Sequence, residues 1–188
     1  MAVLIATTDH HRLPAEVEKE LELTFHETVE DMIKVCDIVT INCPLHPKTE
    51  NLFDEDMIGN MKPGSYLVNT ARGKICDAHA VRKALESGQL AGYGGDVWFP
   101  QPAPHDHPWR TMPWHAMTPH TSGTTLSAQA RYAAGVLEIL ECHFENRPIR
   151  TEYLIAKDGN LAGAGAHSYS EGNATKGSEA SAKFKQGK

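Results

Sequence analysis

The stretch Gly-Tyr-Gly-Gly-Asp-Val-Trp-Phe-Pro-Gln-Pro at 92–102 decides how the rest of the chain is interpreted. A short apolar strand ends at Asp96, and the proline-broken loop that follows carries Gln101. A second short strand leads into Met-Thr-Pro-His-Thr-Ser-Gly at 117–123, which places His120 before a long helical pattern. In an open parallel sheet, strands that end in loops form the edge where ligands bind.

Arg72 joins this group from the earlier string Val-Asn-Thr-Ala-Arg-Gly at 68–73, which also follows a predicted strand. One carboxylate, one amide, one imidazole and one guanidinium therefore occur where strands give way to loops. A guanidinium can bind a carboxylate through two charge-assisted hydrogen bonds. This combination predicts a small-molecule active site.

The alternation of strand and helix patterns from residue 2 to residue 145 predicts an α/β fold with a doubly wound, Rossmann-like parallel sheet. Residues 2–8 form a continuous apolar run, typical of a strand buried on both faces. We expect residues 150–155 to be extended and the Gly/Ala/Ser-rich segment from 157 onward to be loosely ordered. The expected strands are 2–8, 23–26, 36–43, 66–69, 92–97 and 115–118, and the expected helices lie near 14–21, 29–35, 54–61, 78–87 and 124–146.

Length and charge exclude several classes of function. The 188 residues suit one domain, or one domain plus a piece of another. Eighteen Lys and Arg against 24 Asp and Glu give a net charge of −6 without a basic stripe, which argues against a nucleic-acid partner. The apolar run near the start is too short for a membrane span or a signal peptide.

The cysteines and histidines predict neither disulfides nor a metal site. The four cysteines lack a Cys-x-x-Cys pair and are typical of reduced, mostly buried thiols in a cytoplasmic protein. The 11 histidines include no His-Glu-x-x-His and no Cys/His ligand spacing, so we expect no metal.

Several strings together resemble one family. They are Asn-x-Pro-Leu-His at 42–46, Val-Asn-Thr-Ala-Arg-Gly at 68–73, Gly-Asp-Val-Trp at 95–98 and His-Thr-Ser-Gly at 120–123, with Asp9 at a strand end. These strings resemble the D-2-hydroxyacid dehydrogenase superfamily, and in particular its NAD-dependent formate dehydrogenases. The loop at 99–104 and the string Gly-Ala-His-Ser-Tyr at 165–169 are similar to the bacterial members.

The resemblance implies NAD as cofactor, formate as substrate and a cytoplasmic homodimer as the intact enzyme. Arg72 and His120 would be catalytic, with Gln101 as the partner of His120. The cofactor-binding residues implied are Asp9, Cys43, Pro44, His46, Thr70, Arg72, Asp96, Ser122 and Gly123.

These roles have plain structural alternatives: a surface arginine for Arg72, a cap or turn residue for Asp96 and a structural histidine for His120. A carboxylate at position 9 would accept hydrogen bonds from the adenosine ribose and repel a 2′-phosphate, although it could also be an ordinary turn residue. Arg12 nearby leaves some use of NADP open. Cys43 is as well explained as a buried thiol at a strand end as by a wall of the adenine pocket.

One expected feature is missing from the sequence. Such enzymes place a strand and a Gly-x-Gly-x-x-Gly turn about 20 residues before the ribose-binding acid, and only eight residues precede Asp9. We therefore expect the carboxyl part of a longer enzyme, inactive alone and requiring an amino-terminal half. Residues 1–146 would be a partial dinucleotide-binding domain lacking its central strand, and 147–188 an extension belonging to the absent domain.

Two other functions stay open. A dehydrogenase for a D-2-hydroxy acid is the nearest alternative, and an acid at position 101 would have favoured it over Gln101. A non-enzymatic dinucleotide-binding or dimerisation module is an alternative of a different class.

Overall fold

The computed structural model describes residues 5–8, 12–154, 156–157 and 160–161. The chain forms two compact units, Met1–Thr121 and Ser122–Lys188. The predicted division into 1–146 and 147–188 stays a prediction, because compactness alone does not assign a segment to a functional domain.

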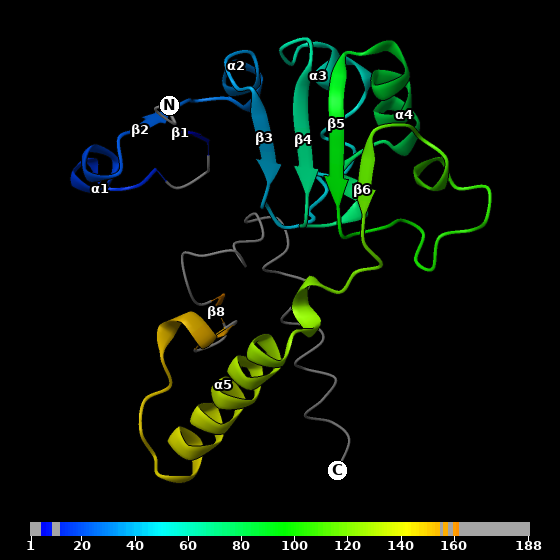
Figure 1. Ribbon diagram of the computed structural model, residues 1–188. Coiled ribbons are helices and arrows are strands. Elements are labelled where there is room, and N and C mark those ends of the chain that lie inside the picture. Colours follow the sequence, from blue (N-terminus) through cyan, green and yellow to red (C-terminus); the bar gives the residue numbers. More distant parts are fainter. Residues whose placement is uncertain (1–4, 9–11, 155, 158–159, 162–188) are drawn as a thin grey trace. The chain divides into compact units, whose positions relative to one another are not determined.

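The first unit contains a four-stranded parallel sheet in the order β3-β4-β5-β6. All four arrows point the same way in Figure 1, so their carboxyl ends share one edge. A helix connects the first strand to the second and the second to the third, as parallel pairing requires, and a loop with the short 3₁₀ turn η2 (Pro108–Arg110) connects the third to the fourth. The strands are β3 (Ile38–Ile41), β4 (Ser65–Asn69), β5 (Leu90–Gly95) and β6 (His115–Met117), and the helices are α2 (Val29–Ile33), α3 (Glu55–Gly59) and α4 (Ala78–Ser87).

The boundaries of α4 follow from its caps, as the sequence predicts. The Asp77 carboxylate accepts hydrogen bonds from the backbone N–H groups of His79 at 2.8 Å and Ala80 at 3.2 Å. Gly88 closes the helix with a φ of 80°, a left-handed conformation that costs glycine little. These two residues fix where the chain turns back toward β5.

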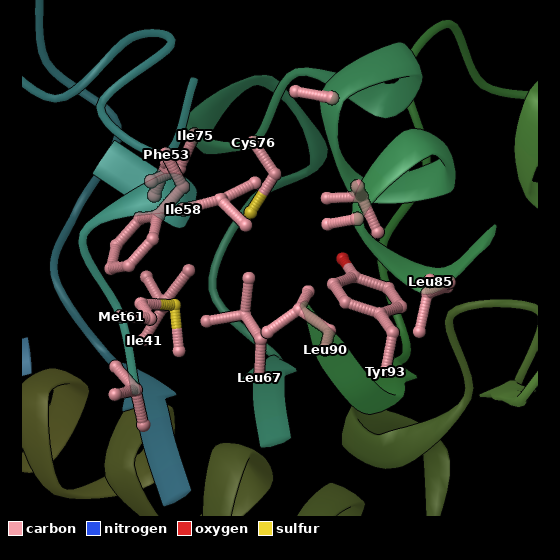
Figure 2. Packing of buried hydrophobic residues seen from close by; sticks show 14 of the residues in the cluster. Ile41, Phe53, Ile58, Met61, Leu67, Ile75, Cys76, Leu85, Leu90 and Tyr93 are labelled. Atoms are coloured by element: carbon pink, nitrogen blue, oxygen red, sulfur yellow. The ribbon is translucent and has the colours of Figure 1, made fainter. Parts of the chain in front are cut away.

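The hydrophobic core lies between the sheet and its helices (Figure 2). Strand residues such as Leu67 and Leu90 are fully buried there, as is Val81 of α4. Alternate residues of β3 and β4 are exposed instead, including Ile38 at 64% and Tyr66 at 50%. One face of this sheet is therefore packed in the first unit, and the other carries exposed apolar side chains.

A second, two-stranded parallel sheet comprises β1 (Ile5–Thr7) and β2 (Leu23–Phe25), joined through α1 (Ala15–Glu20). The prediction that residues 2–8 are buried on both faces is wrong for the described part, since Ile5 is 48% exposed. β1 has one neighbouring strand among the described residues, and that limits its burial. The doubly wound fold has the strand order 3-2-1-4-5-6. In that order β1 and β2 correspond to strands 2 and 3, and β3 corresponds to strand 4. Strand 1, which would lie between the two sheets, is the one that we expect the sequence to lack.

The second unit is built on the long helix α5 (Leu126–Phe144), which follows the short 3₁₀ turn η3 (Ser122–Thr124). Thr125 caps α5 by accepting a hydrogen bond from Ala128 N at 3.2 Å, which confirms the predicted start. The helix ends near the predicted residue 146. No helix in the described ranges is long and apolar enough to cross a membrane.

The prediction of an extended segment at 150–155 is wrong over Thr151–Tyr153, which forms the 3₁₀ turn η4. The Arg150 guanidinium lies 3.0 Å from the Glu138 carboxylate, and the Tyr153 hydroxyl donates to that carboxylate at 3.1 Å. These contacts bend the chain back onto α5. A two-residue antiparallel pair, β7 (Ala156–Lys157) and β8 (Asn160–Leu161), follows, and the predicted loose tail lies mostly outside the described residues.

We expect the two isoleucines at the ends of β3 to differ sharply in their contribution to stability. Ile41 is 3% exposed and Ile38 is 64% exposed, so Ile41→Ala should lower the free energy of unfolding by about 2–5 kcal/mol. Ile38→Ala is the matched control and should cost less than about 1 kcal/mol. Urea denaturation of the two variants measures the difference, and equal losses would contradict the one-sided packing of the sheet.

Candidate active site

Three of the predicted site residues follow three neighbouring strands of the four-stranded sheet. Arg72 comes after β4, Asp96 directly after β5, and His120 after β6. Because these parallel strands end at the same edge (Figure 1), their polar side chains belong to one region. Gln101 reaches this region from the loop between β5 and β6.

Gln101 and His120 are hydrogen-bonded, with 2.9 Å between Gln101 Oε1 and His120 Nδ1. With the amide oxygen as acceptor, Nδ1 is the donor, and Nε2 is the ring nitrogen outside this hydrogen bond. His120 has a φ of 63°, in the left-handed region that non-glycine residues seldom adopt. Such backbone strain persists where surrounding contacts enforce it, and it concentrates at functional sites.

The Asp96 carboxylate joins the ends of two strands. It is 3% exposed, and its Oδ1 accepts hydrogen bonds from Thr118 Oγ1 at 2.5 Å and Thr121 N at 2.8 Å. The backbone N–H of Asp96 donates to Asn69 O at 3.2 Å, at the end of β4. Asp96 thereby fixes the segment that carries His120 relative to β4 and β5.

Asn69 shapes the turn that carries Arg72. Its side chain is fully buried, donates to Arg72 O at 2.9 Å and accepts from Ala71 N at 3.0 Å. The Arg72 side chain is exposed and donates through Nη1 to Ala71 O at 2.7 Å. The turn therefore presents a guanidinium at the surface, while the buried Asn69 side chain holds its backbone through two hydrogen bonds.

The layer beneath this turn is uncharged. Asn69 also donates to Cys76 Sγ at 3.4 Å, and burial raises the pKa of the Cys76 thiol to about 12. Burial likewise raises the pKa of Tyr93, which belongs to the same core cluster (Figure 2), well above its usual range. Both groups stay neutral at physiological pH, so they add no charge that would compete with an anion for Arg72.

The residues expected near the adenine end follow β3. Cys43 and Pro44 come two and three residues after that strand. Cys43 packs against the core, and Pro44 O accepts a hydrogen bond from Thr49 Oγ1 at 2.8 Å. His46 Nδ1 accepts from Lys48 N at 3.2 Å. These contacts give a tight turn at the carboxyl end of β3.

The remaining predicted residues are spread over three places. Thr70 is exposed in the turn between Asn69 and Arg72. Ser122 and Gly123 lie in η3, at the start of the second compact unit. Asp9 lies outside the described residues.

Arg12 is occupied by a neighbouring carboxylate. Its Nε and Nη2 donate to Glu18 at 2.9 Å each, and its guanidinium lies 4.8 Å from the centre of the Phe25 ring. The hydrogen bond with Arg12 lowers the pKa of Glu18 below its ordinary value. Glu18 is therefore ionised near neutral pH and keeps Arg12 engaged.

No group of three or more His, Cys, Asp or Glu side chains within the described ranges is arranged to hold a metal ion. A buried carboxylate, an exposed guanidinium and a paired imidazole at the carboxyl edge of a parallel sheet instead suit an organic ligand. These features define a nucleotide-binding α/β domain with polar groups for a small substrate.

The chain belongs to the family of D-isomer specific 2-hydroxyacid dehydrogenases, as their NAD-binding domain, which it matches over residues 1–122. It is 70% identical to a formate dehydrogenase of Pseudomonas sp. (strain 101) over 179 residues, which are 95% of the chain and 45% of that protein. The chain thus spans less than half the length of this relative.

Solved structures agree with this assignment. A formate dehydrogenase from Granulicella superposes with a TM-score of 0.77 at 62% identity, over 85% of the chain and 42% of that protein. An NAD-dependent formate dehydrogenase from Staphylococcus aureus, solved in complex with NAD, gives a TM-score of 0.60 at 53% identity, over 68% of the chain and 38% of that protein. The predicted resemblance and the predicted α/β class are confirmed.

The side chains at this edge can bind polar groups of a dinucleotide. The carboxylate of Asp96 and the guanidinium of Arg72 follow neighbouring strands at the carboxyl edge of the sheet, where ligands bind in this fold. The sequence contains no Gly-x-Gly-x-x-Gly turn between a strand and a helix, and that turn normally holds the pyrophosphate.

Sequence reasoning missed two residues that support the site. Asn69 enters the sequence analysis only as part of a motif, although a buried amide at the end of an apolar strand has to find partners for its N–H and C=O groups. Thr118 was treated as the end of a strand, whereas its hydroxyl donates to Asp96. The partners of Asn69 are two and three residues away, so a local turn of the Asn side chain was a usable signal. The role of Thr118 has no local signal, because its partner follows a neighbouring strand.

We expect Asn69→Ala to destabilise the fold by about 1–3 kcal/mol, because it leaves the part-buried Ala71 N–H without its partner and removes one of the two donors to the Arg72 carbonyl, the other being Ile75 N. Asn42→Ala is the matched control: Asn42 is exposed after β3 and makes one long hydrogen bond, 3.5 Å, to Thr40. Chemical denaturation measures both variants. If the two lose equal stability, Asn69 does not hold the Arg72 turn.

Proposed function

We propose that this chain is the coenzyme-binding part of an NAD-dependent formate dehydrogenase, which oxidises formate to CO₂. The likeness to formate dehydrogenases at 70% and 62% identity supports this reading over other members of the family. The observation that carries it is the hydrogen bond between His120 and an amide, Gln101, at 2.9 Å.

The amide matters because of the proton inventory of the reaction. Reduction of a 2-oxo acid consumes a proton as well as a hydride, and a carboxylate beside the histidine suits that task. Formate oxidation breaks one C–H bond, both electrons leave with the hydrogen, and CO₂ forms without release of a hydroxyl proton. An uncharged partner for His120 therefore fits formate better than a 2-hydroxy acid.

Each side chain has a defined task in this proposal. Arg72 would bind the formate carboxylate through its fork of N–H donors, and His120 would donate a hydrogen bond from Nε2 to a formate oxygen. NAD⁺, when bound, supplies the hydride acceptor. Since the negative charge of formate disappears as CO₂ forms, Arg72 contributes mainly by orienting the substrate.

Gln101 allows His120 to donate in either protonation state. An amide can accept from Nδ1–H of a charged ring, or it can rotate and donate its N–H to Nδ1 of a neutral ring. In both cases Nε2 carries a hydrogen for the substrate. A carboxylate offers only acceptors, so it supports the Nε2 donor in the charged ring alone.

NAD is the expected cofactor rather than NADP. Asp9 would repel a 2′-phosphate, and the pairing of Arg12 with Glu18 supports the same preference by occupying the nearby cation. A cytoplasmic homodimer as the working form is part of the proposal. So is the absence of membrane and nucleic-acid partners.

We expect residues 1–188 alone not to oxidise formate, because the sequence provides no pyrophosphate-binding turn. The test compares the chain with a chimera in which the amino-terminal part of the Pseudomonas relative, which the chain does not match, precedes it. NADH formation from formate is followed by absorbance. Turnover by the chimera and not by the 188-residue chain supports the proposal. A chimera that folds, binds NAD⁺ and does not use formate contradicts it.

Turnover by the chimera should vary little across neutral pH, and Gln101→Glu should introduce a titration in that range and lower the rate. The reason is that a carboxylate supports the His120 donor in only one protonation state. The measurement is the pH dependence of kcat at saturating formate. Equally flat and equally fast profiles would remove Gln101 from the chemistry and with it the argument for formate.

A further inference from the structure

Three loops carry Arg72, Gln101 and His120, and one dipeptide, Trp98-Phe99, belongs to the Gln101 loop and contacts the other two. We propose that Trp98 is a positioning residue, which holds these three side chains in their relative places. The inference rests on the proposed function, because its kinetic consequences require formate turnover.

The first contact is to the His120 segment. The indole Nε1 of Trp98 donates to Thr118 O at 2.8 Å, two residues before His120. The hydroxyl and backbone N–H of Thr118 are themselves bonded to Asp96 Oδ1 at 2.5 Å and Gly95 O at 2.8 Å. The three hydrogen bonds tie Thr118 to the end of β5, and Trp98 supplies the one from the loop side.

The second contact is to the Arg72 turn. A Cβ built on Gly73 would lie 2.4 Å from the carbonyl carbon of Trp98 and 2.6 Å from its oxygen. Only a residue without a side chain allows the backbone after Arg72 to approach the peptide this closely. Lys74 adds a second link, since its ammonium lies 4.5 Å from the centre of the Phe99 ring.

The third contact lies within the Gln101 loop itself. Phe99 O, two residues before Gln101, lies 2.8 Å from His107 Nε2. His107 Nδ1 accepts from Trp109 N at 3.2 Å, so Nε2 carries the hydrogen and donates to Phe99 O. His107 is 5% exposed, so this hydrogen bond fixes the start of the loop from a buried position.

The indole itself is held by aromatic neighbours. The Trp98 ring packs edge-on against His107 at 5.9 Å and Trp109 at 6.1 Å between centroids, and the Arg110 guanidinium lies 5.6 Å from its centre. Arg110 also donates to Ala103 O at 2.7 Å and Pro104 O at 2.8 Å, beyond Gln101. Packing therefore sets the direction of the indole N–H. A residue that positions others needs such support, because its own side chain must be held in one orientation.

The test compares Trp98→Phe with Trp109→Phe. Both substitutions keep an aromatic ring in place and remove an indole N–H, so Trp109→Phe retains a ring against Trp98. The indole nitrogen of Trp109 is buried without a hydrogen-bond partner in the part of the chain that the structure describes, so its loss breaks no hydrogen bond there. In the chimera, Trp98→Phe should lower kcat about tenfold or more and raise the KM for formate, since small displacements of aligned groups cost large rate factors. Trp109→Phe should keep both constants within about twofold, whatever it does to the melting temperature.

Two kinetic results would overturn the inference. One is a Trp98→Phe chimera with unchanged kcat and KM. The other is a loss of activity in both variants that follows their losses in melting temperature, which is what a purely structural role predicts.

Hydrogen exchange separates this inference from the proposed function. In the 188-residue chain, Trp98→Phe should speed amide exchange at Thr118 and Thr121, whose N–H groups bond to Gly95 O and Asp96 Oδ1. Trp109→Phe should not. A wild-type chimera that binds NAD⁺ but leaves formate unchanged refutes the proposed function, and unaltered exchange in Trp98→Phe refutes the positioning role independently.

Discussion

The site depends on the hydrogen bonds that the buried carboxylate of Asp96 makes at the end of β5. Through Oδ1 it binds both a hydroxyl and a backbone N–H of the segment after β6, and through its own N–H it binds the last residue of β4. A charge that is 3% exposed is costly unless it is fully solvated by donors, and here the donors belong to the chain itself. Three separate loops are thereby converted into one rigid edge.

Much of this architecture could be predicted because its signals are local. Asp77 and Gly88 bound α4 through their own chemistry, and alternating strand and helix patterns imply a parallel sheet wherever they occur. The 2.9 Å hydrogen bond between Gln101 and His120 also follows a prediction from the sequence, although their roles stay predictions. The errors arose where burial depends on distant neighbours: Ile5 is exposed because its strand has a single described neighbour, and 150–153 bend because Glu138 binds Arg150.

The separation into two sheets has a consequence for stability that the sequence motifs do not indicate. β1–β2 and β3–β6 are each parallel and each internally bonded, and no described strand pairs one set with the other. Parallel sheets are normally covered on both faces, whereas Ile38 and Tyr66 lie exposed on this one. Apolar surface left in water lowers stability and favours association. A further layer packed on this face would therefore stabilise the described residues of the first unit more than it would stabilise an ordinary domain.

The neutral layer beneath Arg72 has a consequence for the chemical durability of the protein. Thiols react with oxidants and alkylating agents as thiolates, and burial, which raises the pKa of the Cys76 thiol to about 12, keeps that thiol protonated at neutral pH. This sulfur, which accepts a hydrogen bond from Asn69, therefore reacts slowly with peroxide. Oxidative damage would have to begin at a more accessible sulfur, such as the partly exposed Cys36, and the floor of the site would be among the last parts of the molecule to be modified.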